Sequence, residues 1–178
     1  MKVLQLLPIG GPHGPLLDWL CEELSAAFRV PCEILSPPLR PDFAFHAERG
    51  QYHSSELLDR MQQYAGWKSW RVLGVTPVDL YIPILTFVFG EAQMGGKCSV
   101  VSYARLRQEF YGLPADTNLL ARRLLIESIH ELGHTLELHH CENYQCVMSS
   151  SHAVEWIDLK EQTFCIDCAN KARAIASK

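Results

Sequence analysis

The sequence lacks the features that mark several classes of protein. Its 16 lysines and arginines form no long run, and the formal net charge is −4. This charge pattern gives no reason to expect a nucleic-acid or anionic-membrane partner. No internal repeat or low-complexity tract interrupts the chain. Charged residues make up 20% and hydrophobic residues 48% of the composition, a balance typical of globular proteins and not of disordered or fibrous ones.

A hydrophobic run long enough to span a membrane is also missing. The amino-terminal stretch MKVLQLLPIGGP is apolar, but Gln5 and Pro8 interrupt it, and no small-residue cleavage site follows. We interpret this stretch as a buried strand, and we expect a cytoplasmic protein without a membrane partner. Because a reducing cytosol disfavours disulfides, we expect the seven cysteines to be metal ligands or buried thiols.

The spacing of apolar residues predicts an α/β fold. A length of 178 residues suits one domain with a small appendage. Strands are predicted at residues 2–8, 31–35, 70–76, 85–91 and 99–103, and helices at 15–28, 54–65 and from Asp116 or Thr117 to about 136. Residues 36–51 are expected to form a loop, and Ser54 or Ser55 to cap the second helix. The alternation predicts a mixed sheet of four or five strands with two long helices packed behind it.

The stretch HELGHTLELHH, residues 130–140, carries the strongest chemical signal. His130 and His134 lie four residues apart, about 40° around a helix, so both imidazoles leave from one face. They can supply two corners of a tetrahedral zinc site. Glu131 beside them would act as general base on a zinc-activated water that attacks a peptide carbonyl. For these five residues alone, an amphipathic helix with two surface histidines is the alternative.

A third ligand must come from beyond this helix. His140 lies six residues after His134, where the pattern H-E-x-x-H-x-x-G-x-x-H places its third histidine, and His139 is the alternative. Glu137 occupies the place of the glycine, and we expect it to end the helix in a left-handed conformation that costs ~1–2 kcal/mol. The Glu137 carboxylate is itself a possible ligand. However, it would rise ~10 Å from His130 along a continuous helix, so we expect it to point away from the metal.

Four cysteines predict a second metal site. Cys141 and Cys146 form a C-x4-C pair, Cys165 and Cys168 form a C-x2-C pair, and 18 residues separate the two pairs. Such spacing is typical of a closed structural zinc site made of four thiolates. Because Cys141 follows His140 directly, this site would also hold the segment that carries the third histidine. The remaining cysteines lack a partner spacing and are interpreted as core thiols; they are Cys21, Cys32 and Cys98.

Taken together, these motifs resemble the archaemetzincins, a branch of the metzincin zinc peptidases. The likeness rests on HELGH, His140, Cys141-x4-Cys146-x-Met148 and FCIDC, and it extends upstream through RGQYHSSELL, VLGVTPVDLYIPILTFVFGEA and YARLRQEFYG. It implies a metzincin-like twisted mixed sheet with two backing helices, an active-site helix and a small C-terminal zinc-bound subdomain. Two sequence features depart from the family pattern. Glu137 replaces a glycine, and the gap from Met148 to Cys165 is one residue shorter.

The resemblance also implies the roles of individual residues. Two zinc ions per chain are expected, a catalytic one held by His130, His134 and His140, and a structural one held by the four paired cysteines. Glu131 would be the general base, and Met148 would belong to the turn beneath the catalytic metal. The strand at 85–91 would form the edge of the sheet along the cleft, where its backbone pairs with an extended substrate.

We therefore expect one metallopeptidase domain, residues 1–178. It would comprise an N-terminal subdomain, 1–137, that ends in the active-site helix, and a C-terminal subdomain, 138–178, with the four-cysteine site. The expected protein is a monomeric zinc-dependent metallopeptidase with peptide or protein substrates. The alternative is a catalytically weak or inactive zinc-binding protein that binds a peptide or protein partner in its cleft. The sequence leaves open the natural substrate and the choice between endopeptidase and aminopeptidase action.

Overall fold

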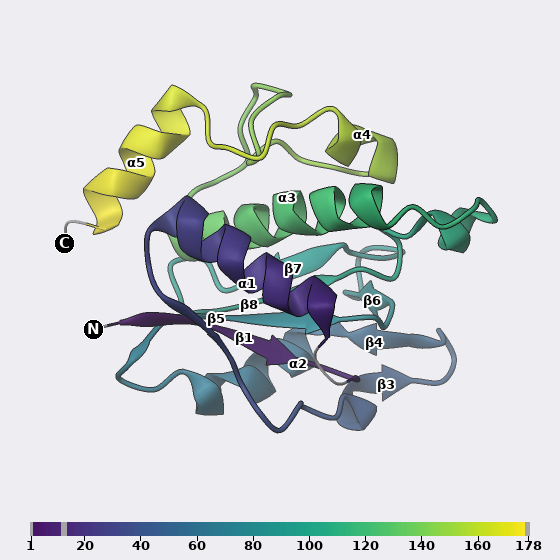
Figure 1. The fold of residues 1–178 in the computed structure, drawn as a ribbon. Coiled ribbons are helices and arrows are strands. Elements are labelled where there is room, and N and C mark those ends of the chain that lie inside the picture. The colour runs from purple at the N-terminus through teal and green to yellow at the C-terminus, as the bar shows by residue number, and fades with distance from the viewer. Residues whose placement is uncertain (1, 12–13, 177–178) are drawn as a thin grey trace.

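A twisted mixed sheet separates two layers of helices (Figure 1). The computed structural model describes residues 2–11 and 14–176. The strands of the main sheet are β1 (Val3–Pro8), β2 (Cys32–Ile34), β5 (Ser69–Thr76), β7 (Gly90–Ala92) and β8 (Cys98–Ser102). They lie in the order β2-β1-β5-β8-β7. All neighbours are parallel except β7, which runs antiparallel to β8 and forms an edge of the sheet.

Two long helices cover one face of this sheet, as predicted. They are α1 (Pro15–Phe28) and α3 (Thr117–Thr135), and they share one hydrophobic core with the strands. The shorter α2 (Ser54–Met61) packs on the opposite face with a second core cluster. The Asp116 carboxylate caps α3 by accepting a hydrogen bond from the Leu119 amide at 2.9 Å. The predicted start of this helix is therefore confirmed.

Smaller elements complete the chain. A second sheet has the order β3-β4-β6 and consists of β3 (Phe45–His46), β4 (Gln51–His53) and β6 (Leu80–Tyr81). Three short 3-10 helices are η1 (Asp42–Ala44), η2 (Gln62–Tyr64) and η3 (Gln108–Tyr111). After α3 come α4 (Val154–Asp158) and α5 (Ile166–Ala176), which lie above α3 in Figure 1. Within residues 2–11 and 14–176, no helix is long and apolar enough to cross a membrane.

Three local predictions were wrong. The predicted loop at 36–51 contains β3 and the start of β4. Of the predicted strand at 85–91, only the last two residues belong to β7, because side chains from the β3–β4 hairpin bind the carbonyls of Leu85 and Thr86. The N-cap of α2 is His53, and the hydroxyls of Ser54 and Ser55 donate to the Glu91 carboxylate instead. In the second and third cases, a partner distant in the sequence overrode the local signal.

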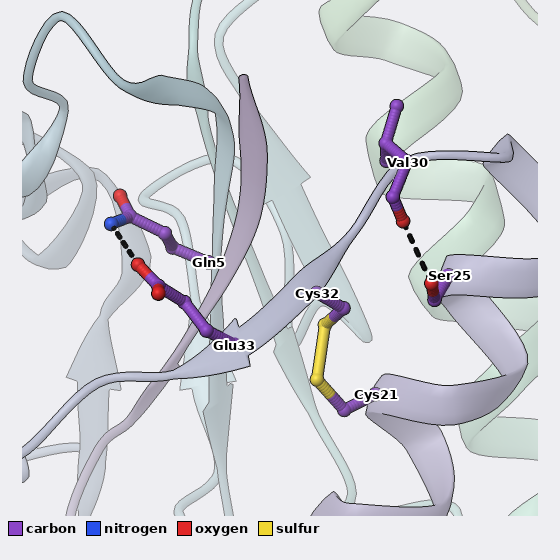
Figure 2. Close-up of a disulfide and its surroundings, with 6 residues drawn as sticks. All are labelled: Gln5, Cys21, Ser25, Val30, Cys32 and Glu33. Atoms are coloured by element: carbon purple, nitrogen blue, oxygen red, sulfur yellow. Dashed lines mark hydrogen bonds between the residues drawn. A yellow bond between two sulfur atoms is a disulfide. The ribbon is translucent and has the colours of Figure 1, made fainter. Parts of the chain in front are cut away.

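A disulfide joins Cys21 of α1 to Cys32 of β2 (Figure 2). This bond corrects the interpretation of both residues as core thiols. Their Cα atoms lie 5.6 Å apart, an ordinary separation for a disulfide. The spacing of Cys21 and Cys32 does not indicate this bond, because the two sulfur atoms meet only when α1 packs beside the edge of the sheet. Cys98 is a buried free thiol, as predicted, and burial raises its pKa to about 11.

The disulfide can be tested by counting thiols. We expect protein that is denatured with a chelator but not reduced to take up five alkyl groups, because five cysteines are free. Reduction before alkylation should raise the number to seven. Intact-mass spectrometry measures both numbers. Seven groups without reduction would show that the bond is absent.

The same bond should contribute to stability. The double variant Cys21→Ser/Cys32→Ser should lose ~3 kcal/mol of unfolding free energy, because the bond closes a short loop in the unfolded chain. Urea denaturation measures this loss. As the control, a reducing agent should lower the stability of the wild type toward that of the variant and should leave the variant unchanged.

Candidate metal centres

The second half of α3 brings two imidazoles together. The Nε2 atoms of His130 and His134 lie 3.1 Å apart. The other nitrogen of each ring meets a backbone carbonyl: Nδ1 of His130 donates to Val147 at 2.8 Å, and Nδ1 of His134 donates to Leu138 at 2.7 Å. Since a carbonyl only accepts, each Nδ1 carries the hydrogen. Both Nε2 atoms of the neutral rings therefore present lone pairs to each other.

This arrangement fits a bound cation. Burial lowers the pKa of His130 well below its usual range, and it also lowers the pKa of His134. Both rings are therefore neutral near pH 7, which is the form that binds a metal. Two facing lone pairs repel each other, and a cation between them removes the repulsion. Carbonyl partners on the far nitrogens are common among metal-binding histidines, because they fix the ring orientation.

The chain turns after the end of α3 and brings a third imidazole, that of His140, close to the first two. α3 ends at Thr135, and Glu137 takes the left-handed conformation with φ 59°. The centroid of the His140 ring then lies 5.3 Å from the centroid of the His130 ring and 5.0 Å from that of the His134 ring. Each of these three histidines offers a nitrogen within 4.8 Å of the others. His139, the alternative third ligand, is exposed and is not part of this group.

The side chain of Glu137 is not part of the histidine group and does not line the cleft over it. It lies against Gly95, in the turn between β7 and β8, where an added Cβ would be 3.0 Å from Cγ and 3.2 Å from Oε1 of Glu137. The Gly95 amide also donates to the His134 carbonyl at 3.1 Å. The predicted left-handed conformation and outward orientation of Glu137 are thus both confirmed.

Glu131 is buried beside the histidines. Its carboxylate lies so close to Gly90 of β7 that an added Cβ there would come within 2.6 Å of Cγ and Oε1. Any larger residue at position 90 would therefore displace the carboxylate. Burial is the main cause that raises the pKa of Glu131 well above its usual range, and the charge of Glu127 acts in the same direction.

An ion pair that the sequence did not reveal lies next to Glu131. The Lys160 ammonium is 3.2 Å from Glu127 Oε1, and both side chains are almost fully buried. Glu127 lies three residues before His130 on α3, a spacing that could have drawn attention to it. No comparable signal exists for Lys160, which reaches this position from the segment after α4.

Met148 packs against the same helix. It is fully buried, and a Cβ added to Gly133 would overlap its sulfur atom. The glycine of HELGH therefore leaves the space that this side chain fills. The preceding residue, Val147, supplies the carbonyl that holds His130. Residues 147 and 148 thus contact both His130 and the helix that carries it.

The four paired cysteines form a second group, with sulfur atoms within 4.8 Å of one another. The sulfur atoms of Cys141 and Cys165 are 3.8 Å apart. Amide groups of Met148 and Cys165 donate to the Cys146 sulfur at 3.4 and 3.3 Å. Backbone hydrogen bonding from Cys168 lowers the pKa of Cys165 to about 7. Four sulfur atoms grouped this closely fit a structural zinc ion.

A cleft of about 510 Å³ opens over the histidines. One wall consists of residues 85–92, which include β7, and residues 150–152 line it as well. The three histidines, Glu127 and Glu131 also line it. The candidate catalytic residues therefore face a space that can hold part of a peptide.

Comparison with known proteins identifies the family. A family model described as peptidase family M54 matches residues 31–174. The chain belongs to peptidase family M54, the archaemetzincins. The archaemetzincin of Methanocaldococcus jannaschii is 43% identical over 164 residues, which are 92% of this chain and 89% of that protein. The resemblance inferred from the motifs is thus confirmed.

Solved structures of relatives agree with the fold. The crystal structure of the Methanopyrus kandleri archaemetzincin has a TM-score of 0.83 at 34% identity and covers 99% of this chain and 97% of that one. A zinc-dependent peptidase from Methanocorpusculum labreanum has a TM-score of 0.86 at 29% identity, with 95% and 99% covered. As an archaemetzincin, the protein is a zinc-dependent metallopeptidase whose substrates are peptides.

The left-handed residue offers a test of the turn that follows α3. Glu137→Gly should raise the unfolding free energy by ~1 kcal/mol, because glycine takes this conformation without strain. It should leave the zinc content unchanged. Arg29, which follows α1 with φ 55° and does not line the cleft, is a matched control, and Arg29→Gly should stabilise the protein similarly. A marked loss of zinc from Glu137→Gly alone would identify Glu137 as a ligand.

Proposed function

We propose that His130, His134 and His140 hold the catalytic zinc ion and that Glu131 is the general base of this metallopeptidase. The observation that carries the proposal is the meeting of three ring nitrogens, two of them 3.1 Å apart, beside a buried carboxylate in the cleft. Three protein ligands leave a fourth position open, as in catalytic zinc sites. When bound, the zinc ion supplies a Lewis acid that polarises the scissile carbonyl and lowers the pKa of water.

The chain's own contribution is to move a proton. Glu131 would take a proton from the attacking water at its carboxylate and later give it to the leaving amide nitrogen. Its dry surroundings favour the uncharged form, so the carboxylate accepts a proton readily. The contact with Gly90 fixes the carboxylate at the edge of the sheet.

The substrate peptide would bind along β7. This strand is an antiparallel edge strand, and its residues line the cleft. An extended peptide can add to such an edge through main-chain hydrogen bonds. The peptide would then run past Glu131, because Gly90 of β7 contacts that side chain.

A second, structural zinc ion would bind Cys141, Cys146, Cys165 and Cys168, which gives two ions per chain. We also propose that the parts 1–137 and 138–178 form one peptidase domain. This is supported by the core cluster on the α1 and α3 side of the sheet, which includes buried residues of both parts.

The alternative is a weak or inactive zinc protein that binds a partner, and the replacement of a glycine by Glu137 is the sequence feature that bears on it. Glu137 takes the conformation that the glycine would take, and its side chain leaves the histidines free. The replacement of the glycine by Glu137 therefore gives no reason to expect an inactive protein. We propose a catalytically active metallopeptidase.

The base can be tested by substitution. Glu131→Ala should reduce cleavage of a broad peptide library by at least ~10²-fold, because a general base contributes about that much. The zinc content should stay at the wild-type value, since Glu131 is not proposed as a ligand. Digests analysed by mass spectrometry, together with metal analysis of the same sample, measure both quantities.

Neighbouring histidines supply the controls for this experiment. His139→Ala should retain activity and both zinc ions, whereas His140→Ala should lose activity and the catalytic zinc ion. Cleavage that persists in zinc-loaded Glu131→Ala would refute the proposed mechanism. A loss of zinc from His139→Ala but not from His140→Ala would reassign the third ligand.

The cysteine site should be coupled to the catalytic site. Cys141 follows His140, and its amide donates to the Met148 carbonyl at 3.0 Å. Cys165→Ser should therefore lower the melting temperature and also weaken zinc binding by the histidines. Thermal unfolding and competition with a chelator measure these effects. Cys98→Ala, which removes a thiol outside the cluster, should keep both zinc ions. An unchanged melting temperature and histidine-site affinity in Cys165→Ser would exclude the coupling.

A further inference from the structure

A third group of possible ligands lies outside both centres described above. His46 at the end of β3, His53 at the end of β4 and Glu56 in the first turn of α2 each offer one ligand atom within 4.8 Å of the others. Nε2 of His46 is 3.1 Å, and Nδ1 of His53 is 3.0 Å, from the same Glu56 oxygen, Oε1.

Regular structure and packing hold these side chains in place. β3 and β4 are antiparallel, and α2 begins immediately after His53. The ring of His53 stacks on Tyr81 with centroids 5.2 Å apart and an interplanar angle of 26°. His46 meets the same ring edge-on at 5.5 Å. Because the rings are already packed, a bound ion would order few additional side-chain torsions.

We propose that His46, His53 and Glu56 bind a divalent transition-metal ion, and zinc above all. Two imidazole nitrogens and one carboxylate oxygen form a donor set that suits zinc and its neighbours. The exposed side-chain fractions, 46% for His46, 20% for His53 and 39% for Glu56, leave room for water as the remaining ligand. Magnesium and calcium prefer sites made of oxygen alone.

The charges around the site are mixed. Glu56 supplies the carboxylate of the group, and both imidazole rings approach its Oε1 atom. The guanidinium of Arg49 lies 4.0 Å from the centre of the Tyr81 ring and adds a positive charge nearby. With three ligands, partial exposure and this neighbouring cation, the site should bind zinc more weakly than the four-cysteine group.

The location connects this site to the cleft. Arg49, in the turn between β3 and β4, donates to the carbonyls of Leu85 and Thr86 at 2.9 and 3.1 Å. Gln51 of β4 donates to Thr86 at 3.0 Å. Leu85 and Thr86 both line the cleft. An ion that ties the β3–β4 hairpin to α2 would therefore stabilise one wall of the substrate site.

The test compares metal binding by matched variants of the full-length protein. Zinc-loaded wild type and Glu56→Gln are dialysed against the same series of free Zn²⁺ concentrations, and zinc per chain is measured by mass spectrometry. The wild type should bind one more ion than Glu56→Gln, and its melting temperature should rise with added zinc where that of the variant does not. Affinity for this ion should fall by more than about 10-fold in the variant.

Glu48→Gln is the matched control, because it removes an exposed carboxylate from the turn of the same hairpin. It should keep the additional ion. His46→Ala should lose the ion as Glu56→Gln does, and it provides a second variant should Glu56→Gln fold poorly. A zinc-soaked crystal should give an anomalous peak between the three side chains.

Equal zinc binding by the wild type, Glu56→Gln and His46→Ala would overturn the proposal and leave a hydrogen-bond network in which Glu56 accepts from both rings. Loss of the ion from Glu48→Gln would also overturn it, because the binding would then follow surface charge and not these ligands. Since the measured quantity is bound metal and not cleavage, the result does not depend on the proposed catalytic roles.

Discussion

The meeting of three imidazoles depends on where α3 stops. In a continuous helix, a residue six positions after His134 would lie about 9 Å further along the axis and on another face. The left-handed conformation of Glu137 breaks the helix, so that His140 returns to the rings of α3. The same break exposes the Leu138 carbonyl that orients His134. It also directs the chain into the cysteine group. Both candidate metal centres therefore depend on one turn of the backbone.

The segment after this turn supports the candidate active site as much as α3 does. Val147 holds His130 through its carbonyl, and Lys160 pairs with Glu127 one helical turn before the proposed base. A buried pair of this kind is costly to break, at about 3–5 kcal/mol when one partner is removed. It therefore fixes the segment in position even though its helices are short. Stability and site geometry are consequently difficult to separate in this protein.

Local patterns predicted the parts of the structure that depend on neighbours in the sequence. The cap at Asp116, the extent of α1 and the grouping of the histidines and cysteines follow from periodicity and spacing of a few residues. The bond between Cys21 and Cys32 requires a helix to pack beside a strand. The bends at 85–89 require hydrogen bonds from residues more than 30 positions earlier. Lys160 likewise finds Glu127 only in the folded chain. Such partners are determined by tertiary packing, and the neighbouring residues in the sequence do not indicate them.

The short edge strand β7 also affects how the molecules behave in concentrated solution. An unpaired strand edge that accepts an extended peptide can equally accept the same strand of another copy, which is a route to aggregation. β7 has only three residues, and a turn with two glycines follows it. Short length is a common protection of exposed edges. A ladder of this length can hold a flexible peptide for one reaction, yet it is too short to join two folded sheets firmly.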